Sequence, residues 1–409
     1  MDLFNAVVNA FNGAEGYFFL FELALIVLAV KILGHWSVRL GQPSVFGKLL
    51  AGIILGPSLL NLIHPSPLIA ELAEVGVILL MFLAGIETDI QEFRKSALAS
   101  TFVAFGGVIV PFFGGMLTAS MFGYEIATAV FVGALLVATS VSISVQTLKE
   151  LGRLKSKEGV TILGAAVLDD VLGVITLSAV LGFTAGGVDG GTGAGAILTV
   201  LIKIVVFFAI AVLLGYFALP KVMAWFKNLN VTQTVLSVGI VSALLFAYLG
   251  ELFGVAGIVG AYVCGLMLSL TPFREELTHR VEAFSYPFFV PMFFFNIGLV
   301  ANFQEMSTGI IWFSLVLSFV AVITKIIGCG IGAKLSKFTT RDSVGIGVGM
   351  VARGEVGLII AMIGIERGLI DNDLFGAAVI VVLVTTLVTP PLLKLALPKR
   401  SDDPAGAEA

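Results

Sequence analysis

The sequence predicts an all-α protein that crosses a membrane about thirteen times. Hydrophobic residues make up 58% of its 409 residues and charged residues only 12%, whereas soluble domains carry about a quarter charged residues. The apolar residues gather in long runs, each near the ~20 residues that a helix needs to cross a bilayer. A membrane β-barrel would instead alternate apolar and polar residues with a period of two. We therefore expect helices.

The candidate spans begin near residue 17, and no cleaved signal peptide is expected because a basic segment followed by a cleavage site is lacking. The glycine-rich stretch 184–195 is typical of a flexible external linker, and 401–409 is typical of a short, polar cytoplasmic tail. The predicted spans cover residues 17–34, 44–63, 67–86, 97–121, 125–148, 158–183, 196–219, 232–250, 254–271, 283–300, 308–334, 342–366 and 373–397.

Basic residues alternate between the two ends of successive spans. Cytoplasmic loops of membrane proteins carry an excess of lysine and arginine, so this alternation predicts an external N-terminus and a cytoplasmic C-terminus. Arg367 is the clear exception. The residues assigned to the cytoplasmic side are Arg39, Lys48, Arg94, Lys95, Lys149, Arg153, Lys155, Lys157, Lys221, Lys227, Arg274, Arg280, Lys334, Lys337, Arg341, Lys394, Lys399 and Arg400.

Three weak internal matches indicate that the chain contains a repeat. The matching stretches are Gly164–Asp170 with Gly376–Val382, Val137–Ser140 with Val351–Gly354, and Leu79–Glu87 with Val290–Gly298. Their members lie seven spans apart, and an odd separation reverses the direction of each paired helix. The first six and the last six spans would therefore form inverted repeats, with the seventh span as the connection.

Two spans at matching repeat positions carry residues that favour an interruption of the helix. Ala138–Ser144 contains four hydroxyl side chains, and Gly345–Gly357 is rich in glycine. Hydroxyls and freed backbone groups can satisfy a broken helix or bind a cation, although both segments are also compatible with ordinary small-residue packing. In folds built from inverted repeats, the binding site lies near the midplane where such helices are interrupted.

Ionisable residues gather at the same depth. Asp169 and Asp170 lie within the sixth span, and an ionised carboxylate in hydrocarbon usually faces a partner or a water-filled cavity. Adjacent carboxylates also repel each other, so we expect at least one of them to exchange protons near neutral pH. Counting ~1.5 Å per residue places Asp169 and five other residues ~14–20 Å from the predicted inner end of their helices. The others are Lys325, Arg353, Glu355, Thr139 and Ser140.

Each of these residues also has a structural explanation. Asp169 and Lys325 could form an ion pair that serves the fold alone. Arg353 and Glu355 could neutralise each other and the ends of a broken helix. Thr139 and Ser140 could satisfy free backbone groups. A purely structural role is hardest to find for Asp170, because its neighbour already accounts for the nearest lysine.

Other classes of function fit the sequence less well. A cation channel would favour symmetric filter loops, whereas the buried charges here are asymmetric. A sodium-coupled symporter of organic anions would need more basic contacts than Arg353 provides. No nucleophile–base pair is apparent, and the two cysteines, Cys264 and Cys329, imply neither a disulfide framework nor a metal cluster. We expect no enzyme activity, no cofactor and no nucleic-acid partner.

Along almost its full length the chain resembles the Kef/Nap-type branch of the monovalent cation:proton antiporter superfamily. The motifs that carry the resemblance are Gly47–Pro57, Leu83–Asp89, Ala138–Ser142, Leu168–Asp170, Lys325 and Arg353–Leu358. The resemblance implies a multi-pass protein of the cell membrane that exchanges a cation for protons and contributes to pH homeostasis. By the same resemblance, the paired aspartates favour Na⁺ over K⁺ as the transported cation. The absence of a cytoplasmic nucleotide-binding domain before Ala409 favours Na⁺ as well, and Li⁺ is a further candidate.

The resemblance also implies roles for individual residues. Asp170 would be the principal carboxylate for the cation and the proton, with Thr139 as a second transient Na⁺ ligand. Asp169 would pair with Lys325, and electrogenic exchange would follow from that pair. Ser140 would line the crossing of the interrupted helices.

The family pattern further implies a homodimer that works by an elevator-type motion. Residues 1–96 and 232–300 would form the dimerisation domain, and residues 97–183 and 308–397 would form the moving core. The linker and connecting helix would occupy 184–231.

Overall fold

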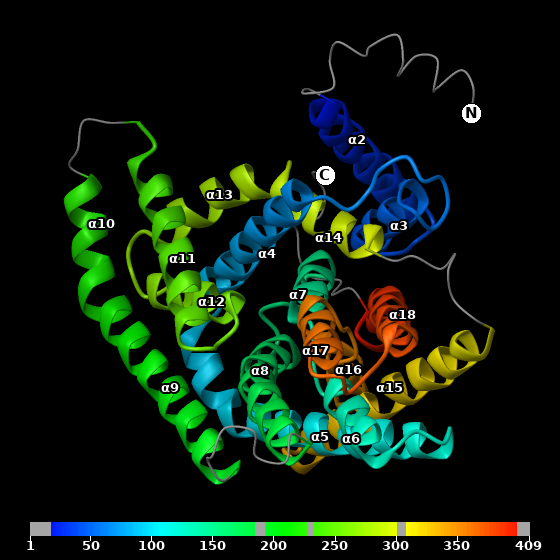
Figure 1. Ribbon diagram of the computed structural model, residues 1–409. Helices are drawn as coiled ribbons and strands as arrows, with labels where there is room; N and C mark the ends of the chain where they lie inside the picture. Colours follow the sequence, from blue (N-terminus) through cyan, green and yellow to red (C-terminus); the bar gives the residue numbers. More distant parts are fainter. Residues whose placement is uncertain (1–17, 185–192, 228–231, 301–307, 399–409) are drawn as a thin grey trace, which may run out of the picture.

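The computed structural model describes residues 18–184, 193–227, 232–300 and 308–398, and these residues form helices, turns and loops without a strand (Figure 1). Eight helices in this part of the chain are long and apolar enough to span a membrane, and five shorter apolar helices accompany them. The tail at 401–409 and residues 185–192 of the predicted linker lie outside the described residues.

In chain order the helices are α2 (Phe18–Arg39), α3 (Ser44–Leu55), α4 (Pro67–Glu87), α5 (Ile90–Met121), α6 (Ile126–Leu135), α7 (Val141–Glu150), α8 (Lys157–Thr184), α9 (Gly193–Leu213), the π-helical turn η2 (Leu214–Ala218), α10 (Leu219–Lys227), α11 (Thr234–Leu252), α12 (Gly257–Leu268), α13 (Arg274–Ser285), α14 (Phe289–Leu299), α15 (Thr308–Leu335), α16 (Thr340–Gly349), α17 (Glu355–Glu366) and α18 (Asn372–Ala396).

Each of the thirteen predicted spans coincides with a helix or a pair of helices, but several boundaries were wrong. The second span ends as a helix at Leu55, because the backbone of Gly56 is extended. The seventh continues through the π-helical turn to Lys227. Helix α13 was not predicted at all, since its sequence is polar and carries no long apolar run.

The helices pack as two groups, which we name the scaffold group and the core group. The scaffold group contains α2–α4 and α11–α14, where α4 packs against α12 and α14. The core group contains α5–α8 and α15–α18, where α5 packs along α15 and α8. Helix α9 contacts α8, α11 and α12 and runs along the edge of the molecule in Figure 1. The two groups meet through α3, α4, α7 and α18.

Close helix packing in the scaffold group follows an inverted repeat. Gly52 of α3 and Gly298 of α14 face each other so closely that an added Cβ would overlap the opposite backbone. The pair formed by Gly85 of α4 and Gly265 of α12 has the same pattern of backbone neighbours. Gly52 of the first repeat corresponds to Gly265 of the second, and Gly85 corresponds to Gly298. The separation in sequence is the same for both pairs. Small residues permit this approach of helices in lipid.

This packing corrects the sequence match in the third span. Aligning Leu79–Glu87 with Val290–Gly298 would pair Gly85 with Asn296, whereas the packing makes Gly298 the equivalent of Gly85. The predicted repeat was therefore right in its helices and displaced by two residues in its register at this point. Glycine-rich helices allow such slips because neighbouring small residues match one another almost equally well.

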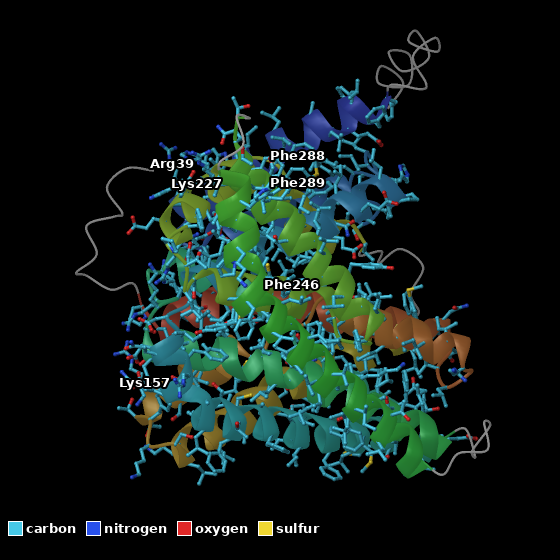
Figure 2. The ribbon with its side chains drawn as sticks, turned by 90° about the vertical axis from the view of Figure 1, so that its left-hand side faces the viewer. Arg39, Lys157, Lys227, Phe246, Phe288 and Phe289 are labelled. Carbon is cyan, nitrogen blue, oxygen red and sulfur yellow. The ribbon has the colours of Figure 1, made fainter. Side chains whose placement is uncertain are left out.

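Basic residues that were assigned to one side of the membrane lie together in space. In Figure 2, Arg39, Lys157 and Lys227 lie toward the same edge of the molecule, although they belong to three different parts of the chain. Phe246 lies nearer the middle of the same view. This arrangement agrees with the alternation from which the orientation was predicted. The direction of the chain relative to the cell stays a prediction.

The two predicted interruptions are present. The backbone leaves the helix at residues 136–140, between α6 and α7, and at residues 350–354, between α16 and α17. The two breaks meet, because the amide of Ser140 donates a hydrogen bond to the carbonyl of Ala352 over 2.7 Å. The hydroxyl of Ser144 also donates to the carbonyl of Gly349, at the end of α16, over 2.5 Å.

Arg353 lies in the second break, and its buried guanidinium donates hydrogen bonds to carbonyl groups of both breaks. It donates to the carbonyl of Leu136, where α6 ends, and to the carbonyl of Val351 over 3.1 Å. The hydroxyl of Thr386 on α18 donates to the carbonyl of Arg353 itself. A cation at the carbonyl end of a helix is also favoured by the helix dipole. Arg353 thus has a structural role at the end of a broken helix, which was one of the explanations that the sequence left open.

We expect Gly52→Ala to destabilise the protein by about 1–3 kcal/mol, because the added methyl group would overlap the backbone of α14. Thermal unfolding of the detergent-solubilised protein measures the loss. Gly309→Ala is the matched control, because a Cβ at Gly309 meets no atom within 4 Å. Equal melting temperatures for the two variants would contradict the close contact between α3 and α14.

We also expect Arg353→Met to lower the melting temperature, because it leaves buried carbonyl groups without donors, at about 1–3 kcal/mol each. Arg367→Met removes an arginine that is exposed just beyond α17 and provides the control. If both variants melted at the wild-type temperature, the guanidinium would not be stabilising the break.

Candidate functional site

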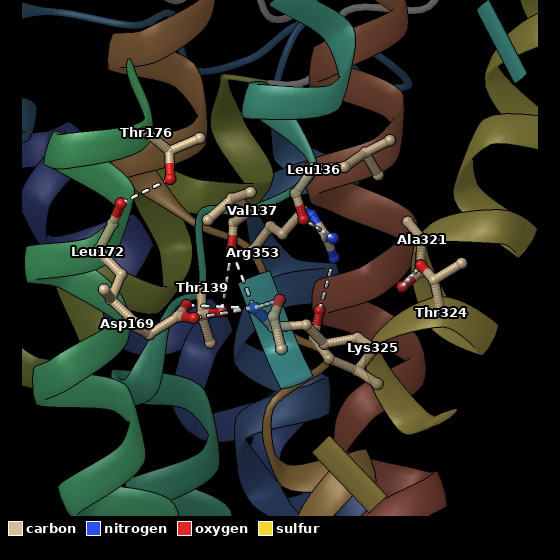
Figure 3. A network of polar contacts seen from close by, with 12 residues as sticks. Leu136, Val137, Thr139, Asp169, Leu172, Thr176, Ala321, Thr324, Lys325 and Arg353 are labelled. Atoms are coloured by element: carbon tan, nitrogen blue, oxygen red, sulfur yellow. Dashed lines mark hydrogen bonds and ion pairs between the residues drawn. The ribbon is translucent and has the colours of Figure 1, made fainter. Parts of the chain in front are cut away.

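A buried ion pair lies beside the crossing of the two breaks (Figure 3). The ammonium of Lys325 lies 3.1 and 3.2 Å from the two carboxylate oxygens of Asp169. Both side chains are fully buried. The pair joins α8 of the first repeat to α15 of the second, and it is the pairing that the family resemblance implied. Charges removed from water in this way are tolerated only where they are paired and hydrogen-bonded.

The ammonium of Lys325 has two further acceptors. It donates to the carbonyl of Gly107 in α5 over 2.8 Å and to the carbonyl of Val137 in the first break over 2.9 Å. An ammonium has three protons, so the two carbonyls and the carboxylate account for all of them. Val137 is free to accept because its carbonyl lies beyond the last helical residue of α6. The lysine therefore links the ion pair to the interrupted backbone.

Glycine brings Lys325 within reach of these groups. Helices α5 and α15 approach so closely at Gly106 and Gly328 that an added Cβ at either would overlap the opposite backbone. At the next residue, a Cβ on Gly107 would lie 2.6 Å from the sulfur of Cys329 and 3.4 Å from the ammonium of Lys325. The absence of a side chain at Gly107 thus leaves its carbonyl accessible to the lysine.

The first break also contributes side chains to the site. Thr139 is buried, and its hydroxyl donates a long hydrogen bond of 3.4 Å to the carbonyl of Val137, beside the carboxylate of Asp169. Ser140 is equally buried, but its hydroxyl has no hydrogen-bond partner among the residues that the structure describes. Hydroxyl oxygens are suitable ligands for a hard cation, as are carboxylates. Thr139 and Ser140 therefore place hydroxyl oxygens of this kind at the crossing of the breaks.

Asp170 differs from its neighbour in exposure. It is half-buried, whereas Asp169 is only 1% exposed. Successive residues of a helix point about 100° apart, so the two carboxylates leave α8 in different directions. Asp169 faces Lys325. The division of roles that the resemblance implied for the two aspartates stays a prediction.

Most of the site residues predicted from the sequence come together. Asp169 and Lys325 are in contact, and Thr139 and Lys325 both donate to the carbonyl of Val137. Ser140 lies beside them where the breaks cross. Arg353 lies next to this cluster and binds the backbone of the same break. The side chain of Glu355 lies outside what the structure describes.

Sequence reasoning missed the backbone acceptors of the site, which are the carbonyls of Gly107, Leu136 and Val137. Every residue carries a carbonyl, so no residue type marks these positions. A signal available in the sequence was the pair Gly106-Gly107 inside an apolar span, because small residues favour the close approach of another group to the backbone.

The chain matches the family model of the sodium/hydrogen exchanger transmembrane region over residues 24–398. It is 48% identical over 376 residues to the Na⁺/H⁺-K⁺ antiporter GerN of Bacillus cereus, which covers 92% of this chain and 95% of the relative. It is 40% identical over 372 residues to a Na⁺/H⁺ antiporter of Enterococcus hirae, with 91% and 96% of the two chains covered.

A solved structure shares the fold. The sodium proton antiporter MjNhaP1 from Methanocaldococcus jannaschii superimposes with a TM-score of 0.66 at 17% sequence identity, over 93% of this chain and 98% of that one. The all-helical fold is thus that of a known structure. The expected Kef/Nap-type branch stays a prediction. The family model covers nearly the whole described chain, and the protein therefore belongs to the sodium/hydrogen exchanger family of membrane transporters.

Proposed function

We propose that this protein is a secondary antiporter that exchanges Na⁺ for H⁺ across a membrane. The observation that carries the proposal is the buried Asp169–Lys325 pair beside two crossing helix breaks, with the half-buried Asp170 next to it. Family membership and the printed names of the relatives point in the same direction. One of those relatives is named a Na⁺/H⁺-K⁺ antiporter, which keeps K⁺ as the second candidate.

In the proposed mechanism, a cation and protons compete for Asp170. An occupied, neutralised carboxylate crosses between the two faces at lower cost than an ionised empty one, and this difference couples the two fluxes. Thr139 and the crossing backbone complete the coordination of the cation. No resident cofactor takes part in this scheme.

Asp169 and Lys325 have a separate role in this proposal. In the empty site the ammonium neutralises Asp169, as in the contacts described above. When a cation binds, its charge weakens the attraction between the two groups, and Lys325 releases a proton. Exchange of more than one proton for each Na⁺ would make transport electrogenic.

We further propose that the core group moves as a rigid unit against the scaffold group, and that the scaffold group forms the contact between two copies of the chain. Such elevator-type motion agrees with the packing of the helices, because contacts within each group are continuous through α5 and α15 or through α4, α12 and α14. The cell membrane is the expected location, with an external N-terminus and a cytoplasmic C-terminus.

The central test is Asp170→Asn in proteoliposomes that contain a pH-sensitive dye. The wild type is expected to collapse an imposed pH gradient when Na⁺ is added, with Li⁺ and K⁺ measured separately to define selectivity. We expect Asp170→Asn to reduce the rate by at least about a hundredfold, because the site loses its titratable group.

Asp373→Asn is the matched control, because it removes an exposed carboxylate from the first turn of α18 by the same substitution. Its rate should equal that of the wild type. Exchange that persists in Asp170→Asn at the rate of the control would refute the assignment of Asp170, and a wild type inactive with all three cations would refute antiport.

A further inference from the structure

Helix α7 connects the candidate site with the scaffold group. Its first residue, Val141, follows Ser140 at the crossing of the breaks, and its last residue is Glu150. A helix of 10 residues is about 15 Å long. Figure 1 shows α7 near the middle of the molecule, with α4 and α14 on one side and α8 and α17 on the other. The two ends of α7 therefore lie in different surroundings.

Lys149, at the end of α7 remote from the site, binds two carboxylates of the scaffold group. Its ammonium lies 2.6 Å from Glu87, the last residue of α4, and also contacts Glu282 of α13. It lies 5.0 Å from the ring centre of Tyr286 as well, which adds a cation–π contact. The side chains of Lys149 and Glu87 are 24% and 10% exposed, so this pair is far better shielded from water than an ordinary surface salt bridge.

Glu150, the adjacent residue, caps a helix of the scaffold group. Helix α3 begins after Pro43, which offers no side-chain acceptor to the free amides of the first turn. The carboxylate of Glu150 takes that role, accepting a hydrogen bond from the amide of Ser44 over 2.6 Å and a second from its hydroxyl. An anion at a helix N-terminus is also favoured by the helix dipole.

Gln146 extends the same contact by one turn of α7. Its amide nitrogen donates to Glu150 over 3.0 Å, and its amide oxygen accepts from the hydroxyl of Tyr286 over 2.9 Å. Residues Gln146, Lys149 and Glu150, with Ser44, Glu87, Glu282 and Tyr286 across the interface, form what we call the α7 clasp.

Water and ions have access to the α7 clasp. A cavity of about 580 Å³ lies beside it and is lined by Lys31, Gln146, Lys149, Glu150, His279 and Glu282, among others. The contact of Lys394 on α18 with the carbonyl of Gly41, where α2 has ended, is another polar contact between the core group and the scaffold group. Lys149 was assigned to the cytoplasmic side, so the clasp lies on the predicted cytoplasmic face.

We propose that the α7 clasp is a conformational lock, which holds the core group against the scaffold group in this state and opens once in each transport cycle. The step rests on the proposed function, because alternating access requires the two groups to move relative to each other. Any such movement separates Lys149 from Glu87 and Glu282, and Glu150 from Ser44. Since the other end of α7 borders the site, a change at the site is transmitted to the lock by one rigid half-helix.

The test is a distance measurement between spin labels on the two groups. Lys155→Cys and Glu275→Cys place labels at exposed positions just beyond α7 and in the first turn of α13. The native thiols of Cys264 and Cys329 are buried, so labelling is directed to the introduced pair. In lipid nanodiscs without Na⁺, we expect Lys149→Met combined with Glu150→Gln to raise the population of a second distance at least about fivefold, the lower end of typical coupling between sites.

Three further variants make the result decisive. Lys149→Arg keeps the charge and should retain the wild-type distribution. Lys95→Met combined with Glu92→Gln makes the same charge change, but removes an exposed ion pair within α5 that joins no two groups; it should also match the wild type. Glu150→Gln alone is the milder change and should give a distribution between those of the wild type and the double variant. It also serves as the test if the double variant folds poorly.

An unchanged distribution in monodisperse Glu150→Gln and in the double variant would overturn the proposal. An equal shift in the α5 control would overturn it too, because the effect would then be general loosening. The distance measurement needs no transport, so a wild type that fails to exchange cations for protons refutes the proposed function by a separate result.

Discussion

The structure depends on one constraint, which is that hydrocarbon offers no hydrogen bonds to free backbone groups or charges. The first break leaves the carbonyls of Leu136 and Val137 without partners in their own helix. Arg353 and Lys325 supply the missing donors. Two buried cations then require a negative charge nearby, and Asp169 provides it through its contact with Lys325. The candidate site is in this sense the consequence of interrupting a helix inside a membrane.

The two repeats make unequal contributions to this arrangement. The carboxylate of Asp169 and the carbonyls of Gly107, Leu136 and Val137 belong to the first repeat, whereas both cations belong to the second. The carbonyl groups of the second break and of the end of α16 have donors from both repeats. The amide of Ser140 and the hydroxyl of Ser144 come from the first repeat, and Arg353 and Thr386 come from the second. Neither half can therefore form the site alone. A fold that is symmetric in its helix packing, as the glycine pairs indicate, carries an asymmetric polar centre.

Much of the fold followed from the sequence, because apolar length and the distribution of lysine and arginine are strong signals in membrane proteins. The interruptions near Thr139 and Gly354 were predicted from composition and from their matching repeat positions, whereas the pairing of Asp169 with Lys325 was implied by the family resemblance. Helix α13 was missed because its polar sequence lacks an apolar run, and the ends of α3 and α10 were misplaced. The carbonyl ligands of Lys325 were unpredictable, since they arise from tertiary packing at Gly107 and carry no residue signature.

The central claim is that the ammonium of Lys325 both compensates the buried charge and contributes a proton to each cycle. Charge movement recorded from proteoliposomes adsorbed on a solid-supported membrane tests it directly, with wild type compared to Lys325→Gln. Glutamine keeps a hydrogen-bond donor for the carbonyls of Gly107 and Val137 but has no charge to lose. We expect a Na⁺-driven current in the wild type and exchange with little or no net current in Lys325→Gln. An undiminished current in the variant would contradict the release of a proton from Lys325 in each cycle.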